Sequence, residues 1–289
     1  MLVATQWQLR DRVLEFDGPV GIGIVNVTDD SMFEGARSGT PERAIEDGLR
    51  LAEAGFEMLD VGAVAARSGP PVAAEQEAER LVPAISGLAQ RTDLPISADT
   101  FSAAVAERAL DAGAVAINDI SGSADPDLLG LVAATGCGLV VMHIEGPPRK
   151  DREPPRYEDP VDHLRRWFSE RIEAAVGEGV APEQIALDPG FDFDLSVADD
   201  LAILRRLVEL GRLGQPLYVS VSRKDFLGAV LAGSWESRLP AAEREWATDA
   251  VVALAVSRGA NLLRLHDESA LQAMRVAAAI EGPRGAPVG

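Results

Sequence analysis

Residues 103–122 read AAVAERALDAGAVAINDISG and contain one complete unit of a pattern that the rest of the chain repeats. Ala103–Ala112 is predicted to form a helix, and Gly113 follows it as a left-handed cap. Ala114–Asp119 is a short apolar run, typical of a parallel strand that is buried on both faces. The strand ends on two polar side chains, Asn118 and Asp119. A helix, a capping glycine and a buried strand with a polar end predict one unit of a parallel α/β fold.

The same unit recurs along the whole chain. Eight apolar runs rich in Val, Ile and Leu are predicted as strands: Val20–Val27, Glu57–Gly62, Leu94–Asp99, Ala114–Asp119, Gly138–His143, Gln184–Asp188, Pro216–Ser222 and Asn261–His266. Helices are predicted over Pro41–Ala54, Ala73–Gln90, Ala103–Ala112, Pro126–Ala134, Pro160–Gly177, Val197–Leu210, Ala241–Ser257 and Ser269–Ile280. Eight such units predict a (β/α)8 TIM barrel. A doubly wound open sheet is the alternative, but no G-x-G-x-x-G follows the first strand.

Composition limits the protein's class and its partners. The chain has 289 residues and a net charge of −19, which argues against nucleic acid or an anionic membrane as a partner. The start of the chain is too polar for a signal peptide and no apolar run is long enough to span a bilayer, so we expect a cytoplasmic protein. Cys137, the only cysteine, excludes an intrachain disulfide. Without a convincing linker, we expect a single domain over residues 1–289, with the barrel over about 18–281 and a frayed tail at 282–289.

The predicted strands end on hydrogen-bonding or charged side chains. These are Asn26, Asp60, Asp99, Asn118, Asp119, His143, Asp188, Ser222, Arg223, Lys224, Arg264, His266 and Asp267. Single polar residues at strand ends are often caps or turn-formers, and Asp60, Asp119 and Asp267 fit that simpler interpretation. Buried charges need partners. The set therefore predicts a site at the carboxyl ends of the strands, where barrel enzymes place their chemistry.

The residue types at these ends indicate two kinds of ligand group. Carboxylates and an amide, from Asp99, Asn118 and Asp188, suit a flat heterocycle that carries ring N–H and amino donors. Cations and donors, from residues such as Lys224 and Arg264, suit an anion or a metal–phosphate group. Because the chain is acidic overall, an anionic ligand requires that its few cations gather at the site.

Seven motifs, in order along the chain, resemble those of the dihydropteroate synthase family. They are Gly23–Ser31 (GIVNVTDDS), Ile96–Thr100 (ISADT), Ile117–Gly122 (INDISG), Val141–His143 (VMH), Leu187–Gly190 (LDPG), Ser222–Lys224 (SRK) and Leu263–Asp267 (LRLHD). The resemblance implies a pterin-binding TIM barrel, usually a homodimer. It also implies a transferase of folate biosynthesis, which joins 7,8-dihydropterin-6-ylmethyl diphosphate to 4-aminobenzoate and releases pyrophosphate with the help of Mg²⁺.

Matching the motifs residue by residue implies a role for each position. The pterin ring would be held by Asp99, Asn118, Asp188 and Lys224, with Met142 packed on it. The diphosphate would be held by Asn26, Arg67, Arg264 and His266, with Asn26 also the metal-binding residue for Mg²⁺. Asp30 would help to build the closed site, and the resemblance implies catalytic roles for Asp99, Asp30, Arg67 and Lys224.

The sequence departs from the family pattern in the loops after the first, second and sixth strands. Met32 stands where the family has Phe, and Gly62–Gly69 (GAVAARSG) keeps Arg67 but lacks the usual Glu, Ser, Thr and Pro. Asp188–Leu195 (DPGFDFDL) replaces two glycines with aspartates and a lysine with leucine. Asp225 follows Lys224 in place of Ser, where a carboxylate would repel the carboxylate of 4-aminobenzoate unless it points to solvent, pairs with Arg223 or caps a helix.

These departures leave an alternative hypothesis open. It is a homologue that binds pterin diphosphate but has impaired or changed use of 4-aminobenzoate and sulfonamides. A pterin-using methyltransferase on the same barrel is less favoured, because the motifs at Ser222–Lys224 and Leu263–Asp267 are those of the synthase. A metal hydrolase is weaker still, because His143 and His266 alone make no ligand set with the usual spacing. His163, in a charged helix, is expected to be exposed.

Overall fold

Eight parallel strands form a closed barrel in the computed structural model, which describes residues 4–27, 38–65, 71–150 and 155–282. The strands are β3 (Val20–Asn26), β4 (Met58–Gly62), β5 (Ile96–Asp99), β6 (Ala116–Asp119), β7 (Gly138–Met142), β8 (Ile185–Asp188), β9 (Tyr218–Val219) and β10 (Leu262–Leu265). Their order in the sheet is β8-β7-β6-β5-β4-β3-β10-β9. A bridge between Leu187 and Leu217 joins the two ends of the sheet, and the N–H of Leu187 donates to the carbonyl of Pro216 over 2.9 Å. The predicted TIM barrel is confirmed.

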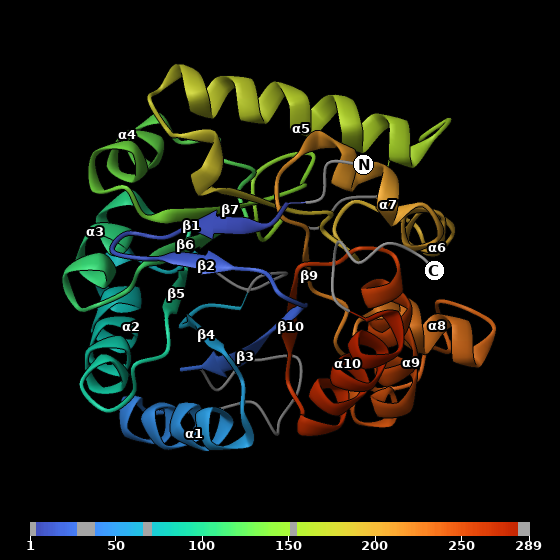
Figure 1. The fold of residues 1–289 in the computed structure, drawn as a ribbon, viewed down its shortest axis with the longest axis horizontal. Helices are drawn as coiled ribbons and strands as arrows, with labels where there is room; N and C mark the ends of the chain where they lie inside the picture. The colour runs from blue at the N-terminus through green and yellow to red at the C-terminus, as the bar shows by residue number, and fades with distance from the viewer. Residues whose placement is uncertain (1–3, 28–37, 66–70, 151–154, 283–289) are drawn as a thin grey trace.

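Helices surround the barrel (Figure 1). They are α1 (Pro41–Ala54), α2 (Ala74–Ala89), α3 (Ala103–Asp111), α4 (Pro126–Thr135), α5 (Pro160–Gly177), α6 (Val197–Arg205), α7 (Leu207–Leu210), α8 (Asp225–Ala232), α9 (Glu245–Ser257) and α10 (Glu268–Glu281). The predicted start and end of α1 are correct, because Thr40 caps the N–H of Arg43 and Gly55 takes the left-handed conformation, with φ of 93°. None of the helices within the described ranges has the length and apolarity needed to span a bilayer.

Two predictions of local structure are wrong. The helix predicted over Val197–Leu210 is divided at Arg206 into α6 and α7. The predicted strand Pro216–Ser222 shortens to β9, and the apolar segment that follows it forms α8, which was not predicted. Apolar runs of this length fit a strand or a short buried helix equally well, so periodicity alone does not separate the two.

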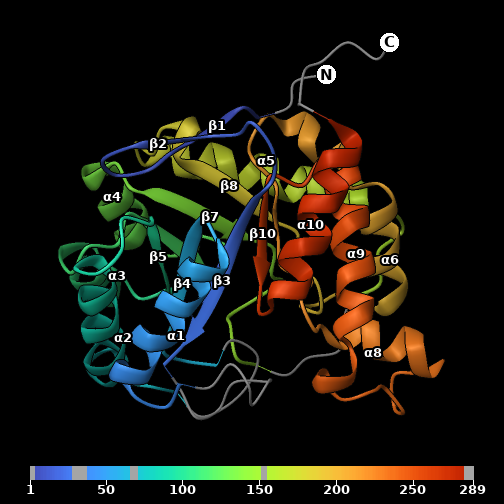
Figure 2. The same cartoon turned by 60° about the horizontal axis from the view of Figure 1, so that its bottom comes forward.

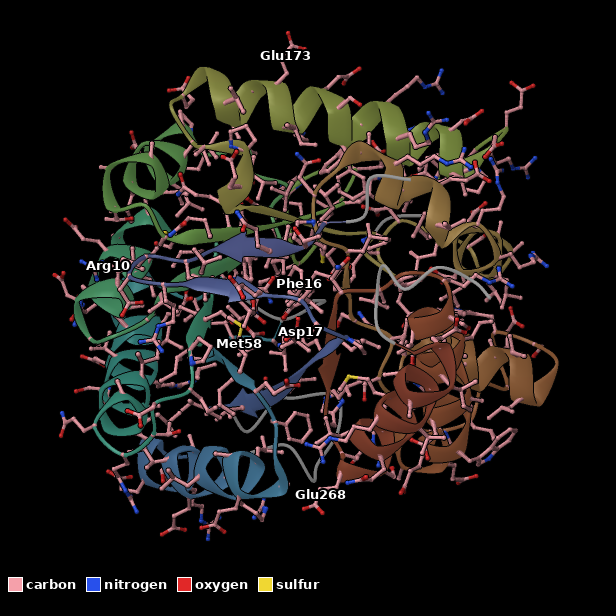
Figure 3. All side chains as sticks on the ribbon, in the orientation of Figure 1. Arg10, Phe16, Asp17, Met58, Glu173 and Glu268 are labelled. Atoms are coloured by element: carbon pink, nitrogen blue, oxygen red, sulfur yellow. The ribbon has the colours of Figure 1, made fainter. Side chains whose placement is uncertain are left out.

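An N-terminal hairpin closes one end of the barrel. β1 (Gln6–Gln8) pairs antiparallel with β2 (Val13–Glu15), and Figure 2 shows the hairpin lying across the end of the barrel opposite to the arrowhead of β3. Trp7 is fully buried, and its indole N–H donates to the carbonyl of Gln184 over 2.7 Å. In Figure 3, Phe16 and Met58 lie inside the ring of helices, whereas Glu173 projects outward from α5. A ligand site must therefore lie at the other end, where the strands finish.

Replacement of Trp7 with alanine is expected to lower the free energy of unfolding by about 3–5 kcal/mol, because it leaves a large cavity under the hairpin. Trp235, whose exposed fraction is 38%, provides the matched control. Its replacement should cost much less, about 1 kcal/mol at most. Urea unfolding of both variants measures the difference, and equal losses would contradict the closing role of the hairpin.

Candidate active site

The inward-facing side chains of the barrel form two layers. Below, next to the hairpin, an apolar cluster contains Ile22, Met58, Ala116, Val140, Ala186, Tyr218 and Leu262. Successive inward positions of a strand are two residues apart, so the next layer up is occupied by Ile24, Asp60, Asn118, Met142, Asp188, Ser220 and Arg264. A mainly polar layer thus lies directly above an apolar floor, at the level where the strands end.

An ion-pair network centred on Asp60 connects four strands in this layer. Nε of Arg264 lies 2.5 Å from Oδ2 of Asp60, and Nη2 lies 2.9 Å from Oδ2 of Asp99. The amide of Asn118 donates to Oδ2 of Asp60 over 3.0 Å, and the hydroxyl of Ser97 donates to Oδ1 over 2.6 Å. Asp60 has no exposed surface. The interpretation of Asp60 as a cap is therefore wrong: it is the residue that holds Arg264 and Asn118 in place.

Two carboxyl groups at this level of the barrel, those of Asp188 and Asp99, have raised pKa values. Burial raises the pKa of Asp188 to about 6, although its Oδ1 accepts from the N–H of Gly190 over 2.8 Å and Lys224 opposes the shift. Burial also raises the pKa of Asp99, against the opposing charge of Arg264. Buried carboxyl groups whose pKa values lie near neutral pH are frequent in binding and catalytic sites.

The end of the barrel at which the strands finish is called the mouth, and one wall of the mouth is apolar. Ile120, Met142 and Ile144 form a buried cluster, against which Phe101 and Phe193 pack. Beside this wall, the ammonium group of the buried Lys224 lies 4.5 Å from the centroid of the Phe193 ring. Flat apolar surface beside carboxylate and amide groups is the environment that a polar aromatic ring requires.

The opposite side of the mouth presents hydrogen-bond donors. His266 follows β10, and its Nδ1 lies 2.9 Å from the hydroxyl oxygen of Ser222, which also accepts from the backbone N–H of His266 over 3.3 Å. The hydroxyl of Ser222 donates to Nδ1 when the imidazole proton is on Nε2, and accepts from Nδ1–H in the other tautomer. Desolvation, together with the charges of Arg264, Arg223 and Lys224, lowers the pKa of His266 to about 3. His266 is therefore a neutral donor at pH 7.

The remaining predicted residues divide into three groups. Asn26 ends β3 on the same face of the strand as Ile22, and so belongs to the mouth. Asp119 is a turn-former, as expected, because its carboxylate accepts from the N–H groups of Ser121 and Ser123 over 2.7 and 2.9 Å. Three further positions, Asp30, Met32 and Arg67, lie outside the described residues, as does the tail over 283–289.

Arg223 serves the scaffold. Its Nε lies 2.7 Å from Oδ2 of Asp267, and its Nη1 donates to the carbonyl of Ala241 over 3.0 Å. Its neighbour Lys224 is directed to the mouth instead. The two cations of the SRK motif thus have different roles, which the sequence did not distinguish.

Two of the unusual aspartates stabilise the start of α8. Asp192, with φ of 67°, accepts from the N–H groups of Asp225 and Phe226 over 2.5 and 2.9 Å. Asp225 itself pairs with Arg244, whose Nη1 lies 2.7 Å from Oδ1. The expected repulsion between Asp225 and a ligand carboxylate is therefore offset, since Arg244 already balances its charge. Capping a helix N-terminus and pairing with Arg244 account for both substitutions.

A TIM barrel with this mouth has the groups needed to hold a polar aromatic ring and an anion together. Residues 22–266 match the family described as pterin binding enzyme. The dihydropteroate synthase of Synechocystis sp. is 38% identical over 90% of this chain and 89% of that protein, and that of Escherichia coli K12 is 33% identical over 91% and 92%. The chain belongs to the dihydropteroate synthase family of pterin-binding enzymes.

Solved structures agree with this assignment. A dihydropteroate synthase of Xanthomonas albilineans with 4-aminobenzoic acid superposes with a TM-score of 0.86, at 37% identity, over 96% of this chain and 99% of that one. A Yersinia pestis dihydropteroate synthase in complex with a sulfonamide drug gives a TM-score of 0.89, at 33% identity, over 96% and 98%. The likeness extends over essentially the whole barrel.

Proposed function

We propose that this protein catalyses the dihydropteroate synthase reaction in folate biosynthesis. In this reaction 7,8-dihydropterin-6-ylmethyl diphosphate condenses with 4-aminobenzoate and pyrophosphate leaves. The observation that carries the proposal is the polar layer above the apolar floor, in which Asp60 fixes Arg264 and Asn118, Asp99 pairs with Arg264 through Oδ2, and Asp188 lies at the same level. Family membership over residues 22–266 supports the same reaction.

The pterin ring is proposed to bind against Met142 and the apolar wall. The carboxylates of Asp99 and Asp188 would accept hydrogen bonds from its ring N–H and amino groups. The amide of Asn118 and the ammonium group of Lys224 would donate to its acceptor atoms. Lys224 also favours the ionised form of both carboxyl groups. The ring would thus be recognised by a buried set of donors and acceptors that a non-polar ring could not satisfy.

The diphosphate is proposed to bind on the donor side of the mouth, to Arg264, to Nε2–H of His266 and to Asn26. Arg67 would add a further cation and Asp30 would help to build the closed site. Asn26 offers one amide oxygen at a strand end, which fits Mg²⁺ because that ion takes its other ligands from water and phosphate. When bound, Mg²⁺ would offset the charge that develops on the leaving pyrophosphate.

The residues of the chain act by position and charge. As the bond between the pterin methylene and the diphosphate oxygen breaks, positive charge spreads over the pterin, and the carboxylate of Asp99 stabilises it. The amine of 4-aminobenzoate is neutral at pH 7, so it attacks the methylene without a strong base and releases a proton after the new C–N bond forms. Arg264 and His266 stabilise the negative charge on the pyrophosphate.

The second substrate is proposed to be 4-aminobenzoate itself. Repulsion by Asp225 is one argument for impaired use, and its pairing with Arg244 offsets that repulsion. The other argument, the altered pocket wall at Met32 and beside Arg67, concerns positions outside the described residues. The related structures that hold 4-aminobenzoic acid and a sulfonamide drug are at least 33% identical to this chain. We therefore favour the full synthase reaction over pterin binding alone.

A homodimer in the cytoplasm is also proposed. Large apolar side chains remain exposed on two adjacent helices of the barrel, at Trp246 of α9 and at Val276 and Ile280 of α10. Exposed apolar side chains gathered on neighbouring helices favour a partner surface. The acidic chain and its single, buried cysteine fit a reducing compartment.

Pterin affinity is expected to fall as the pH drops from 8 to 5. Asp99 and Asp188 must both be ionised to accept from the ring, and their pKa values are about 7 and about 6, so binding is lost in two steps as the pH falls through those values. Each group should lower affinity by up to about tenfold per pH unit below its own pKa. Titration of a pterin between pH 5 and pH 8 measures this. The Asp188→Asn variant should bind weakly throughout with a shallower fall, and an equally steep fall would contradict the assignment.

The proposed reaction is tested with purified protein, Mg²⁺, the pterin diphosphate and 4-aminobenzoate. We expect pyrophosphate and dihydropteroate to form in equal amounts, with inhibition by a sulfonamide that competes with 4-aminobenzoate. Binding of the pterin diphosphate without condensation would favour the alternative of altered second-substrate use. Absence of pterin binding would overturn both.

A further inference from the structure

A second cluster of ligand-type side chains lies beside the mouth, and the proposed reaction does not use it. The chain has three histidines, and two of them contact the same carboxylate. Nε2 of His143 lies 3.3 Å from Oε1 of Glu145, and Nε2 of His163 lies 2.6 Å from the same oxygen. All three ligand atoms fall within 4.8 Å of one another.

The backbone at each of the three residues is fixed by a strand end, a hydrogen bond or a helix start. His143 directly follows β7, is fully buried, and donates its backbone N–H to the carbonyl of Asp188 over 2.9 Å. Glu145 donates its backbone N–H to the carboxylate of Asp194 over 2.9 Å. His163 belongs to the first turns of α5, which begins at a capping Asp159. The ligand groups are therefore positioned by a strand end and a helix start.

His163 departs from the sequence prediction. It was expected to be exposed on a charged helix, but only 27% of its side chain is accessible. Its ring lies against His143 at 5.5 Å between centroids and against Tyr157 at 4.4 Å. A helix that is polar on its surface thus directs one imidazole inward, toward the residues that follow β7.

The donor set is that of a zinc-type ion. Two imidazoles and one carboxylate, with a fourth position open, are a common ligand set of protein-bound Zn²⁺. Two atoms bound to one zinc ion at about 2.0–2.1 Å lie roughly 3.3 Å apart, so the His143–Glu145 spacing already fits and the carboxylate must move back slightly from His163. Nδ1 of His143 has no hydrogen-bond partner among the described residues, so the ring can carry its proton there and present Nε2 to an ion.

We propose that His143, Glu145 and His163 bind a transition-metal dication of the zinc class. The site is distinct from the proposed Mg²⁺ position at Asn26, because Mg²⁺ prefers oxygen ligands and this set is rich in nitrogen. The hydroxyl of Tyr157, 3.3 Å from Oε1 of Glu145, borders the open position. Since His143 follows Met142 directly, the ion would tie the start of α5 to the apolar wall of the mouth.

The proposal is tested on the full chain after removal of metal with a chelator. Calorimetric titration with Zn²⁺, and with Co²⁺ read by its visible absorption, should give one site per chain with the spectrum of a tetrahedral ion that binds nitrogen. Excess Mg²⁺ should not displace either ion. The assay contains no substrate, so its outcome is independent of the proposed reaction.

Variants identify the ligands. His163→Ala and Glu145→Gln should each weaken Zn²⁺ binding at least about tenfold, because even loss of a residue that only orients a ligand costs 10- to 100-fold. Glu158→Gln, the same change at an exposed position next to Tyr157, should leave binding unchanged. A folded His163→Gln protein, verified by circular dichroism, provides a second test of the same ligand. The proposal is overturned if the parent protein binds no zinc, or if these ligand variants bind it as the parent does.

Discussion

Replacement of Lys224 with alanine is expected to weaken binding of the pterin diphosphate by about 30-fold or more. The ammonium group is buried beside Phe193, and its charge favours ionised Asp99 and Asp188. Truncation of one partner in a buried set of charges costs about 2–5 kcal/mol, which corresponds to about 30- to 4,000-fold in affinity. The two carboxyl groups would then also bind protons more readily, and so accept less well from the ring.

Isothermal titration of both proteins with the pterin diphosphate provides the measurement. Lys150→Ala is the matched control, because Lys150 is exposed and its replacement removes the same charge from the chain. It should bind as the parent protein does. Equal affinity in the Lys224 variant would show that the ring does not bind where the polar layer and Phe193 meet.

The barrel itself could be predicted because each strand is buried on both faces. A continuous apolar run such as that of β7 remains visible without any knowledge of its neighbours, and capping residues such as Thr40 and Gly55 mark the helix ends locally. The hairpin of β1 and β2 could not be found in this way. Its strands have three residues each, and Trp7 donates to the carbonyl of Gln184, which lies 177 positions further along the chain.

Much of the site could be predicted from strand ends, but the role of Asp60 could not. It lies within β4, so the pattern of polar strand ends alone does not separate it from a cap. Inward positions alternate, however, so Asp60 shares its face with Met58 in the floor. An aspartate on that face needs a cation, and Arg264 is the one that reaches it across β3. Strand parity, applied to all eight runs, is the signal that would have identified it.

Contacts between elements that are distant in the sequence could not be predicted for a different reason. Arg244 balances Asp225 and His163 turns toward His143, yet neither pair follows from a local pattern. Such pairs depend on how helices dock on the barrel. Substitutions that look damaging in one loop can therefore be compensated by a charge that arrives from another element.

Replacement of Asp60 with asparagine is expected to destabilise the protein by about 3 kcal/mol and to lower kcat/KM about 100-fold. Removing one partner of a buried ion pair leaves the other incompletely compensated, and Arg264 would keep only Asp99. The new amide group would also face the donors of Asn118 and Arg264. Displacement of a substrate-positioning side chain by about 1 Å can cost about 100-fold in rate.

Two comparisons separate this positioning role from simple loss of stability. Ser97→Ala removes the 2.6 Å hydrogen bond to Asp60 but keeps the ion pair, so it should cost about 1 kcal/mol and leave activity close to that of the parent. In the Asp60 variant, KM for the pterin diphosphate should rise, because Arg264 is proposed to bind that substrate, while KM for 4-aminobenzoate should stay constant. If both variants lost the same stability and both KM values rose together, Asp60 would be a structural residue only. A rise confined to the diphosphate substrate would instead mean that the buried carboxylate acts through the guanidinium it holds.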